Sequence, residues 1–516
     1  MLPARALAGD EYARARESYG GVEVYLRSAE AAGMSHSELE RELEQRMREL
    51  ARQLLQAHLD ARGDGEASAP VTGADGVTRP GQRLQERELE TVFGAVTVRR
   101  VGYGAPGVES LHPKDAALNL PEERYSLEVR RRAALEAAKV SFDEVVATLE
   151  RSTGAHVPKR QAEELVVRAA RDFDAFYEQC RASPREGAAG AAIVVLSFDG
   201  KGVVMRRQDL REPTRKAAAR RTRKLATRLS RGEKRNAKRM ATVSAVYTIA
   251  PYPRTAEQVV RSLARTEEAP SRPRPEHKRV SASLEKTSQE VIAEGFAEAV
   301  HRDPERERTW VVVVDGSKPQ LRLIEQEAAR LRVRPVIVLD IIHVIEYLWK
   351  AGMVFHTEGS GELEAWVRAR LLAILEGSSS QVAAGMRRSA TRRGVPVAAR
   401  KAVDTCANYL LAYRRYLRYD DYLARGLPIA TGVIEGACRH LVKDRMDLTG
   451  ARWSLAGAEA VLRLRALRAS GDFDEYWRFH EAREYKRNHE ARYASGSVPS
   501  VKPPQPAAQR RLKLVT

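Results

Sequence analysis

The sequence has little of what marks secreted, membrane-spanning or disulfide-stabilised proteins. Its longest apolar runs, such as 193–196 and 310–314, have the length of a β-strand, whereas a membrane span needs about 20 apolar residues. The three cysteines lie far apart, which argues against a disulfide framework and a CxxC zinc site. Aromatic residues make up only 6%, which is low for a β-sandwich or propeller. No signal peptide is recognisable, so we expect a cytoplasmic protein with no membrane partner.

Positive charge is what the sequence has in excess. Its 516 residues include 88 Lys and Arg against 69 Asp and Glu, which gives a net charge of +19. A hydrophobic fraction of 43% excludes a wholly disordered chain, and the length predicts about three domains. The excess of cations predicts a polyanionic partner, and nucleic acid is the obvious one.

The charge is concentrated in the basic stretch 206–239, which holds 15 Lys and Arg and three acids. Contacts to many phosphates make DNA binding strongly dependent on salt. We therefore predict that Arg220, Arg221, Arg223 and Lys224 bind DNA. The alternative is a solvated charged helix or arm.

The N-terminal part shows one clear helix, predicted over 35–59. Its leucines recur at steps near 3.6, so they form one apolar stripe. The stripe suits packing against a neighbouring domain as well as dimerisation. Residues 1–33 show little periodicity, residues 63–81 are predicted as a linker, and residues 89–103 as a short β-hairpin.

A helix-turn-helix pattern follows. Helices are predicted over 127–140, from Ser141 to about 151, and from Pro158 to about 170, with Gly154 breaking the second. Basic residues in the first turn of the last helix are typical of a recognition helix. Lys159, Arg160 and Gln161 are the predicted DNA contacts. The alternative is a plain three-helix packing unit.

Beyond residue 190 strands and helices alternate, which predicts an α/β sheet with parallel members. The apolar strands at 191–198, 309–314 and 335–339 are followed by Asp199, Asp315 and Asp340. Ligand sites of such sheets gather at the carboxyl ends of the strands.

The remaining elements are predicted from composition. Further strands are expected at 203–206 and 240–250, a loop at 255–275, helices at 283–301, 319–331, 344–355 and 455–467, helices only over 362–426, and a disordered tail at 495–516. The predicted domains are 1–63, 64–124, 125–186, 187–361, 362–428, 429–470 and 471–516.

Asp199, Asp315 and Glu435 are the candidate catalytic and metal-binding residues. Carboxylates alone suit hard cations such as Mg²⁺ or Mn²⁺. Two such ions about 3.5–4 Å apart can hold the attacking and leaving oxygens of a phosphoryl transfer. The three residues are more than 100 positions apart from one to the next, so only folding can bring them together.

Residues 191–470 resemble the DDE transposases of bacterial insertion sequences, in particular the ISKra group. The matching segments are Leu-Ser-Phe-Asp199-Gly-Lys-Gly, Val-Val-Asp315-Gly-Ser-Lys, Leu-Asp340-Ile-Ile-His343-Val-Ile-Glu-Tyr-Leu-Trp349, Gly-Val-Ile-Glu435-Gly-Ala-Cys-Arg439 and Gly450-Ala-Arg452-Trp453-Ser. The resemblance covers well over half of the chain, and its segments occur in a fixed order.

The resemblance implies an RNase H-like mixed sheet with flanking helices and an all-α insertion, preceded by the helical and helix-turn-helix region. It implies that Asp199 lies on the central strand, Asp315 after the fourth strand and Glu435 on a late helix, with two Mg²⁺ or Mn²⁺ ions per site. The basic stretch would join the second and third strands. Asp340 and His343 would support or orient the site, although Asp340 is equally typical of a helix cap.

Further DNA contacts are expected around these motifs. The candidates are Lys201, Lys318, Arg439, Lys443, Arg452 and Trp453. Arg439 and Lys443 follow Glu435 by four and eight residues, so an α-helix would place them near its carboxylate. Each lysine or arginine also has the alternative of a solvated cation, and Trp453 that of core packing.

The function implied is a DNA transposase. It would bind the terminal inverted repeats of its element and the target DNA as a homodimer or larger assembly, in a bacterial cytoplasm and near the nucleoid. One carboxylate site would cleave a strand and join its 3′-OH to the target. Two alternatives are a nuclease of the same fold without strand transfer, and a DNA-binding regulator with a silent site.

Overall fold

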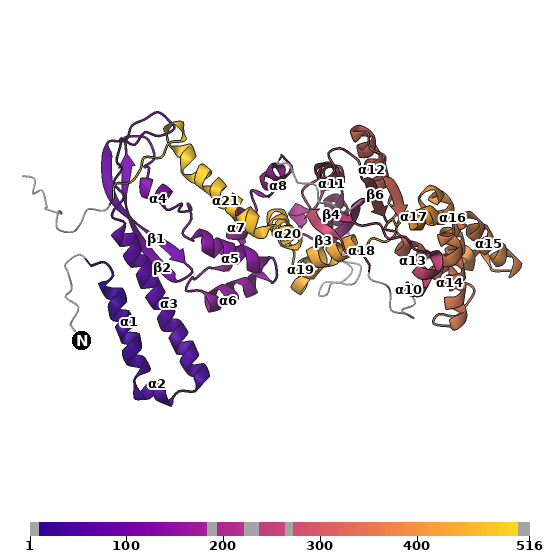
Figure 1. The fold of residues 1–516 in the computed structure, drawn as a ribbon, viewed down its shortest axis with the longest axis horizontal. Coiled ribbons are helices and arrows are strands. Elements are labelled where there is room, and N and C mark those ends of the chain that lie inside the picture. Colours follow the sequence, from indigo (N-terminus) through magenta and orange to yellow (C-terminus); the bar gives the residue numbers. More distant parts are fainter. Residues whose placement is uncertain (1–9, 183–192, 221–236, 264–271, 504–516) are drawn as a thin grey trace, which may run out of the picture. The chain divides into compact units, whose positions relative to one another are not determined.

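The computed structural model describes residues 10–182, 193–220, 237–263 and 272–503 (Figure 1). The chain divides into two compact units. Unit 1 combines Met1–Phe173 with Phe473–Thr516, and unit 2 is Asp174–Asp472. The predicted all-α insertion and the predicted acidic helix both belong to unit 2.

Unit 1 opens with three helices, α1 (Ala13–Leu26), α2 (Ala29–Gly33) and α3 (His36–Ala61). The predicted helix over 35–59 is confirmed as α3, which begins with a capping box between Ser35 and Glu38. Helix α1 was not predicted, because its apolar residues recur only weakly at helical spacing. Only a few of its side chains are buried, and it packs against α3.

An antiparallel hairpin follows, made by β1 (Gly81–Thr91) and β2 (Gly94–Gly104). It confirms the predicted hairpin at 89–103 and is longer at its N-terminal side. The short helix α4 (Pro113–Ala117) leads on to the helical part of the unit.

The predicted three helices are present as α5 (Leu127–Ala137), α6 (Phe142–Ser152) and α7 (Lys159–Ala169). The Ser141 hydroxyl accepts a hydrogen bond from the Glu144 N–H at 3.3 Å, as expected of an N-cap. The connection between α6 and α7 is six residues long, so it is no tight turn.

Gly154 explains the length of that connection. Its N–H donates to the Val92 carbonyl at 2.9 Å, and a Cβ at this position would lie 2.5 Å from the Phe93 oxygen. The connection is therefore shaped by the tip of the β1–β2 hairpin and admits only glycine there.

The C-terminal helix α21 (Phe473–Asn488) completes unit 1. The segment after it contradicts the predicted disordered tail as far as residue 503. Lys502 N donates to the Glu66 carbonyl at 2.7 Å, and Val501 forms a bridge with Ala67 in the predicted linker. Residues 504–516 lie outside the described part.

Unit 2 is a mixed α/β fold around a five-stranded sheet. Its strands are β3 (Ile193–Val204), β4 (Lys238–Ile249), β5 (Glu276–Ser283), β6 (Thr309–Val314) and β7 (Val336–Leu339). The order is β5-β4-β3-β6-β7, so β3 lies in the middle. Strand β3 is antiparallel to β4 and parallel to β6, β4 is antiparallel to β5, and β6 is parallel to β7.

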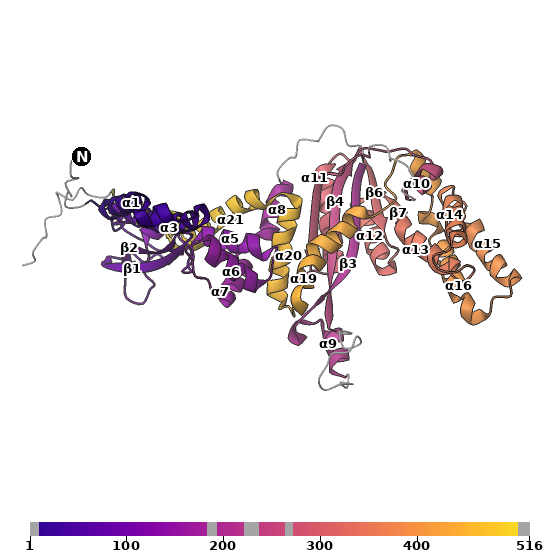
Figure 2. The same cartoon turned by 90° about the horizontal axis from the view of Figure 1, so that it is seen from below.

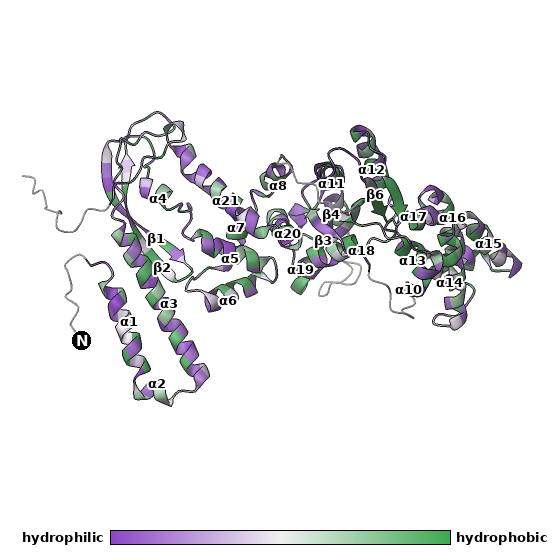
Figure 3. Ribbon diagram, viewed as in Figure 1, coloured by the Kyte–Doolittle hydropathy of each residue, from purple (hydrophilic) through white to green (hydrophobic). Residues whose placement is uncertain are grey.

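The apolar runs form the buried strands. Residues Trp310–Val314 of β6 are buried, as expected of a strand covered on both faces (Figure 3). The separate strand predicted at 203–206 is wrong, because β3 continues through Gly200 and Gly202 as one strand paired with β4.

Helices cover the sheet and extend it. Helices α11 (Ser288–Arg302), α12 (Lys318–Leu331) and α13 (Ile341–Gly352) follow the predicted ranges closely. The all-α insertion is confirmed as α14 (Gly361–Leu375), α15 (Ser379–Arg392), α16 (Val397–Ala412) and α17 (Tyr419–Ala424). No helix among the described residues is both long and apolar enough to cross a membrane.

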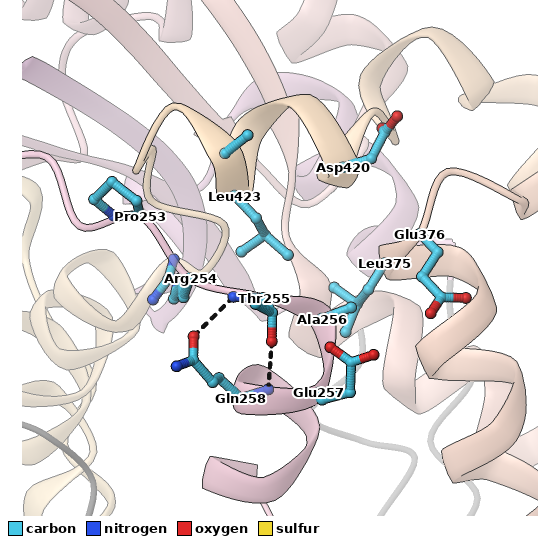
Figure 4. A pocket seen from close by; sticks show the side chains of 11 residues that line it. Pro253, Arg254, Thr255, Ala256, Glu257, Gln258, Leu375, Glu376, Asp420 and Leu423 are labelled. Atoms are coloured by element: carbon cyan, nitrogen blue, oxygen red, sulfur yellow. Dashed lines mark hydrogen bonds between the residues drawn. The ribbon is translucent and has the colours of Figure 1, made fainter.

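The loop predicted at 255–275 contains a helix, α10 (Ala256–Leu263), and is followed directly by β5. Thr255 and Gln258 cap the helix reciprocally, with bonds of 2.8 Å and 3.3 Å (Figure 4). The Thr-x-x-Gln signature at this position was present in the sequence.

The basic stretch joins β3 to β4, which are the first and second strands of this sheet in chain order. The prediction that it joins the second and third strands is therefore wrong. The stretch contains the helix α9 (Glu212–Ala219), which lies at the far end of the two strands (Figure 2). Arg220 is exposed. Arg221, Arg223 and Lys224 lie outside the described residues.

Candidate active site

The strand registers bring three aspartates to one level of the sheet, with Asp199 inside β3 and with Asp315 and Asp340 directly after β6 and β7. The β3–β6 pairing ends at Ser197 and Val313, and the β6–β7 pairing ends at Val314 and Leu339. Continuing the same registers places Asp199, Asp315 and Asp340 side by side. Asp315 and Asp340 follow strand ends as predicted, whereas Asp199 lies within β3, which continues to Val204.

Asp199 lies on the middle strand, just beyond the point where β6 stops pairing. It is half-buried and still pairs with Val243 of β4. Its Oδ1 accepts from the Gly200 N–H at 2.6 Å, and its Oδ2 accepts from the Cys438 thiol at 3.0 Å. Its neighbour Phe198 stacks on Phe296 of α11, with ring centroids 6.4 Å apart.

Glu435 lies on α18 (Gly432–Ala437), which continues as a π-helix (Cys438–Lys443) and then as α19 (Asp444–Met446). Desolvation and the negative charges of Asp340, Glu346 and Asp199 raise the pKa of Glu435. Two interactions relate this helical segment to Asp199 of β3. The charge of Glu435 is repelled by that of Asp199, and the Cys438 thiol donates a hydrogen bond to Asp199. Folding therefore brings Glu435 and Asp199 to one place across more than 230 residues.

Asp315 and Asp340 differ in exposure. Asp315 is half-buried, and its Oδ1 accepts from the Ser317 N–H at 2.8 Å. Asp340 is fully buried and is the N-cap of α13, with its Oδ1 accepting from Ile342 N at 2.9 Å and its Oδ2 from the Thr431 hydroxyl. Burial raises the pKa of Asp340.

The alternative role of Asp340 as a helix cap is confirmed, and its role in supporting or orienting the site stays a prediction. Asp340 caps α13, and through Thr431 it holds the residue that precedes α18. The charge of His343, in the first turn of α13, acts on both Asp340 and Glu435.

The donor set fits a hard divalent cation. Asp199, Asp315 and Glu435 offer only carboxylate oxygens, and no Lys or Arg among the described residues forms an ion pair with any of them. Within the described part of the chain, the one group with three ligand atoms inside 4.8 Å of each other is Asp172, His480 and Glu484 of unit 1. The three strand-end and helix carboxylates are thus gathered more loosely than that group.

The predicted DNA contacts of unit 1 lie at the start of α7. Lys159 Nζ is 2.8 Å from the Asp143 carboxylate, Arg160 pairs with Glu164 at 3.2 Å, and Gln161 is half-buried. Both cations have exposed side chains, with 51% and 87% of their surface accessible. DNA contact there stays a prediction.

Around the carboxylates, Lys318, Arg439, Lys443 and Arg452 are exposed and Lys201 is half-buried. The expected alignment of Arg439 and Lys443 with Glu435 assumed an α-helix. The π-helix that begins at Cys438 widens the turn, so the spacing of four no longer repeats one face.

Trp453 packs in the core, which was the alternative to its predicted contact with DNA. Its side chain is 6% exposed, its Nε1 donates to the Met446 carbonyl at 3.1 Å, and the Arg445 guanidinium lies 4.7 Å from its ring centroid. Its main chain pairs with the end of β3, with its N–H donating to the Val204 carbonyl at 3.1 Å. The ring is therefore covered, and stacking on a base would require it to leave this position.

Two contacts of the site were missed from the sequence. Cys438 is buried, and its thiol donates to Asp199. Its position three residues after Glu435, one helical turn away, was the available signal. Thr431 gave no signal, because its partner Asp340 is 91 residues distant.

One hollow in unit 2 lies away from the carboxylates, between the start of α10 and the ends of α14 and α17 (Figure 4). Its lining mixes apolar Leu375 and Leu423 with the acids Glu257 and Asp420. It contains none of the predicted site residues.

No protein-family model matches the chain, and no curated protein matches it in sequence.

Proposed function

We propose that the protein is a DNA transposase of the DDE type with an RNase H-like catalytic core. The observation that carries the proposal is the placement of three carboxylates on one sheet. Asp199 lies on the middle strand, Asp315 follows its parallel neighbour, and Glu435 approaches from a late helix. The strand order supports such a core, because the pairings β5–β4–β3 are antiparallel and the pairings β3–β6–β7 are parallel.

Asp199, Asp315 and Glu435 would hold two Mg²⁺ or Mn²⁺ ions, which when bound activate the attacking oxygen and stabilise the departing one. The chain's own groups prepare the site. Gly200 and Cys438 fix the two oxygens of Asp199, and Ser317 fixes one oxygen of Asp315. Lys201 and Lys318 follow two of these carboxylates closely and are placed to contact a DNA phosphate.

DNA recognition is assigned to the helix α7 of unit 1 and to the basic stretch between β3 and β4. The partners would be the terminal inverted repeats and the target DNA. Pairing of two ends requires a homodimer or larger assembly, and the work would take place near the nucleoid in the cytoplasm.

The test uses the purified full-length protein, DNA carrying the paired repeats that flank its gene, Mg²⁺ and a target plasmid. Strand cleavage and a joined product are expected. The variants Asp199→Asn, Asp315→Asn and Glu435→Gln should each lose at least about 10³-fold in rate, since each removes a proposed ligand. Glu346→Gln, which removes a neighbouring carboxylate, is the matched control and should retain activity.

Other outcomes contradict the proposal. Cleavage without a joined product would indicate a nuclease. Binding without cleavage would indicate a regulator with a silent site. Cleavage that persists in Asp199→Asn would remove the metal role of this residue.

A further inference from the structure

Tyrosines of the all-α insertion donate hydrogen bonds to main-chain oxygens at the carboxyl ends of β6 and β7. The four pairs are Tyr409 to Asp315 O (3.1 Å), Tyr413 to Gly316 O (2.5 Å), Tyr419 to Leu339 O (2.7 Å) and Tyr422 to Ile337 O (3.3 Å). These oxygens lie next to Asp315 and Asp340, where the strands have ended or are ending. The insertion therefore contacts the main chain that carries the candidate site.

The turn after β6 depends most on these bonds. Asp315 and Gly316 follow the last ladder pair, so their carbonyls have no strand partner in the sheet. Gly316 has a φ of 96°, in the region that only glycine adopts readily. Two consecutive carbonyls of this turn accept from Tyr409 and Tyr413, which are one helical turn apart on the same insertion segment.

The surrounding contacts fix the two tyrosines. The Tyr409 ring stacks on Tyr347 of α13, with centroids 4.1 Å apart, and lies 5.0 Å from the Tyr413 ring. A Cβ on Gly316 would lie 3.5 Å from the Tyr409 hydroxyl, which shows how closely the turn approaches the ring. Phenylalanine at these two positions would provide the same ring packing, so the hydroxyls have a role separate from packing.

We propose that Tyr409 and Tyr413 are positioning residues for Asp315, and that the insertion holds this turn in the form that binds a divalent cation. Asp315 is then fixed in its side chain and in its main chain, because the Ser317 N–H donates to its Oδ1 and the two hydroxyls donate to the main-chain carbonyls of Asp315 and Gly316. The inference rests on the proposed function, because it assigns the carboxylate to a cation.

The test compares the double variant Tyr409→Phe/Tyr413→Phe with Tyr416→Phe in the full-length protein. Tyr416 belongs to the same segment, but its hydroxyl donates at 2.7 Å to the Glu325 side chain instead of the turn. Mn²⁺ affinity is measured by electron paramagnetic resonance, and amide hydrogen exchange is followed for residues 315–318. The double variant should bind Mn²⁺ about tenfold more weakly and exchange faster at the turn, because the two carbonyls lose their hydrogen-bond donors. Tyr416→Phe should match the wild type in both.

Unchanged affinity and exchange in the double variant would overturn the inference while leaving the proposed function intact. Equal losses in Tyr416→Phe would also overturn it, because they would show a general effect on the insertion. If the wild type binds no Mn²⁺, the proposed function fails. The hydrogen exchange result then still decides whether the hydroxyls hold the turn.

Discussion

Two groups of acidic residues, one in each unit, have opposite surroundings. In unit 1, Asp172, His480 and Glu484 are buried and surrounded by arginines. Arg130 Nη1 lies 2.6 Å from Glu484 and 3.0 Å from His480 Nε2, Arg487 lies 2.5 Å from Asp172, and Arg171 also bonds Glu484. In unit 2, no described Lys or Arg pairs with Asp199, Asp315 or Glu435.

The difference shows that distance between ligand atoms does not by itself identify a metal site. The unit 1 group is the tighter of the two, yet its charges are balanced by cations of the protein. The unit 2 group is looser, and no described Lys or Arg pairs with its carboxylates, although the protein has an excess of cations. We therefore interpret the first group as structural and the second as open to an external cation.

The largest expected effect comes from breaking the balance in unit 1. Arg130→Met removes the fully buried cation that pairs with both Glu484 and Glu123 and leaves these acids with the more exposed Arg171, Arg487 and Arg168, so the free energy of unfolding should fall by about 3 kcal/mol. Urea denaturation followed by circular dichroism measures it. The neighbouring Arg131→Met removes a half-exposed pair and should cost less than about 1 kcal/mol. In unit 2, Glu435→Gln should leave stability unchanged or raise it, because it removes repulsion with Asp199 and Asp340.

A loss in Glu435→Gln as large as that in Arg130→Met would contradict the distinction. The carboxylate would then be a part of the packing rather than a free ligand.

Acidification should separate the units in a second way. Burial, with the positive charges of nearby arginines, lowers the pKa of His489 and of His112 to about 4. The folded unit 1 therefore binds protons at these imidazoles less readily than the unfolded chain, and it loses stability as the pH falls from about 6.5 towards 4. Between pH 7 and pH 5 the loss should be roughly 2 kcal/mol or less for each histidine.

Glu435 and Asp340 respond with the opposite sign. Their raised pKa values mean that the folded state takes up protons before the unfolded chain does, so acidification through their range favours folding. Urea denaturation at several pH values measures both trends. His489→Gln should reduce the acid sensitivity of unit 1, and an unaltered pH profile in that variant would contradict the assignment to His489.

The sequence allowed a good part of this comparison to be predicted, and the reasons are local. Strands β6 and β7 are continuous apolar runs, and their aspartates follow directly, so the strand-end group of carboxylates was accessible to pattern reading. Strand β5 was missed because Glu276–Ser283 is an edge strand whose first half is exposed and charged. Helix α1 was missed for its weak periodicity, and β3 was cut short by its two glycines.

The unit 1 group could not have been predicted. Asp172 and His480 are 308 residues apart, and nothing local marks a buried carboxylate as one that arginines will neutralise. The contacts between the insertion and the turn at Asp315 are equally remote in sequence, since they span more than 90 residues. Such pairings are decided by tertiary packing.

The smallest expected effect concerns the thiol that reaches Asp199. Cys438→Ala removes the donor to Oδ2 and should weaken Mn²⁺ binding about three- to tenfold, because the carboxylate is left free to rotate. Cys438→Ser keeps a donor of similar size and should bind nearly as the wild type does. Equal affinities for the alanine and serine variants would show that the hydrogen bond does not orient the ligand.

The split composition of unit 1 has a consequence for the order of synthesis. Helix α21 supplies His480 and Glu484 to the buried group, and it lies near the end of the chain, after the whole of unit 2. A ribosome therefore completes the carboxylate-bearing sheet before the N-terminal helices receive their last partner. A chain that stops before residue 473 would carry the sheet and the acidic helix, but in its proposed DNA-recognition unit Arg130 would keep Glu123 and lack Glu484.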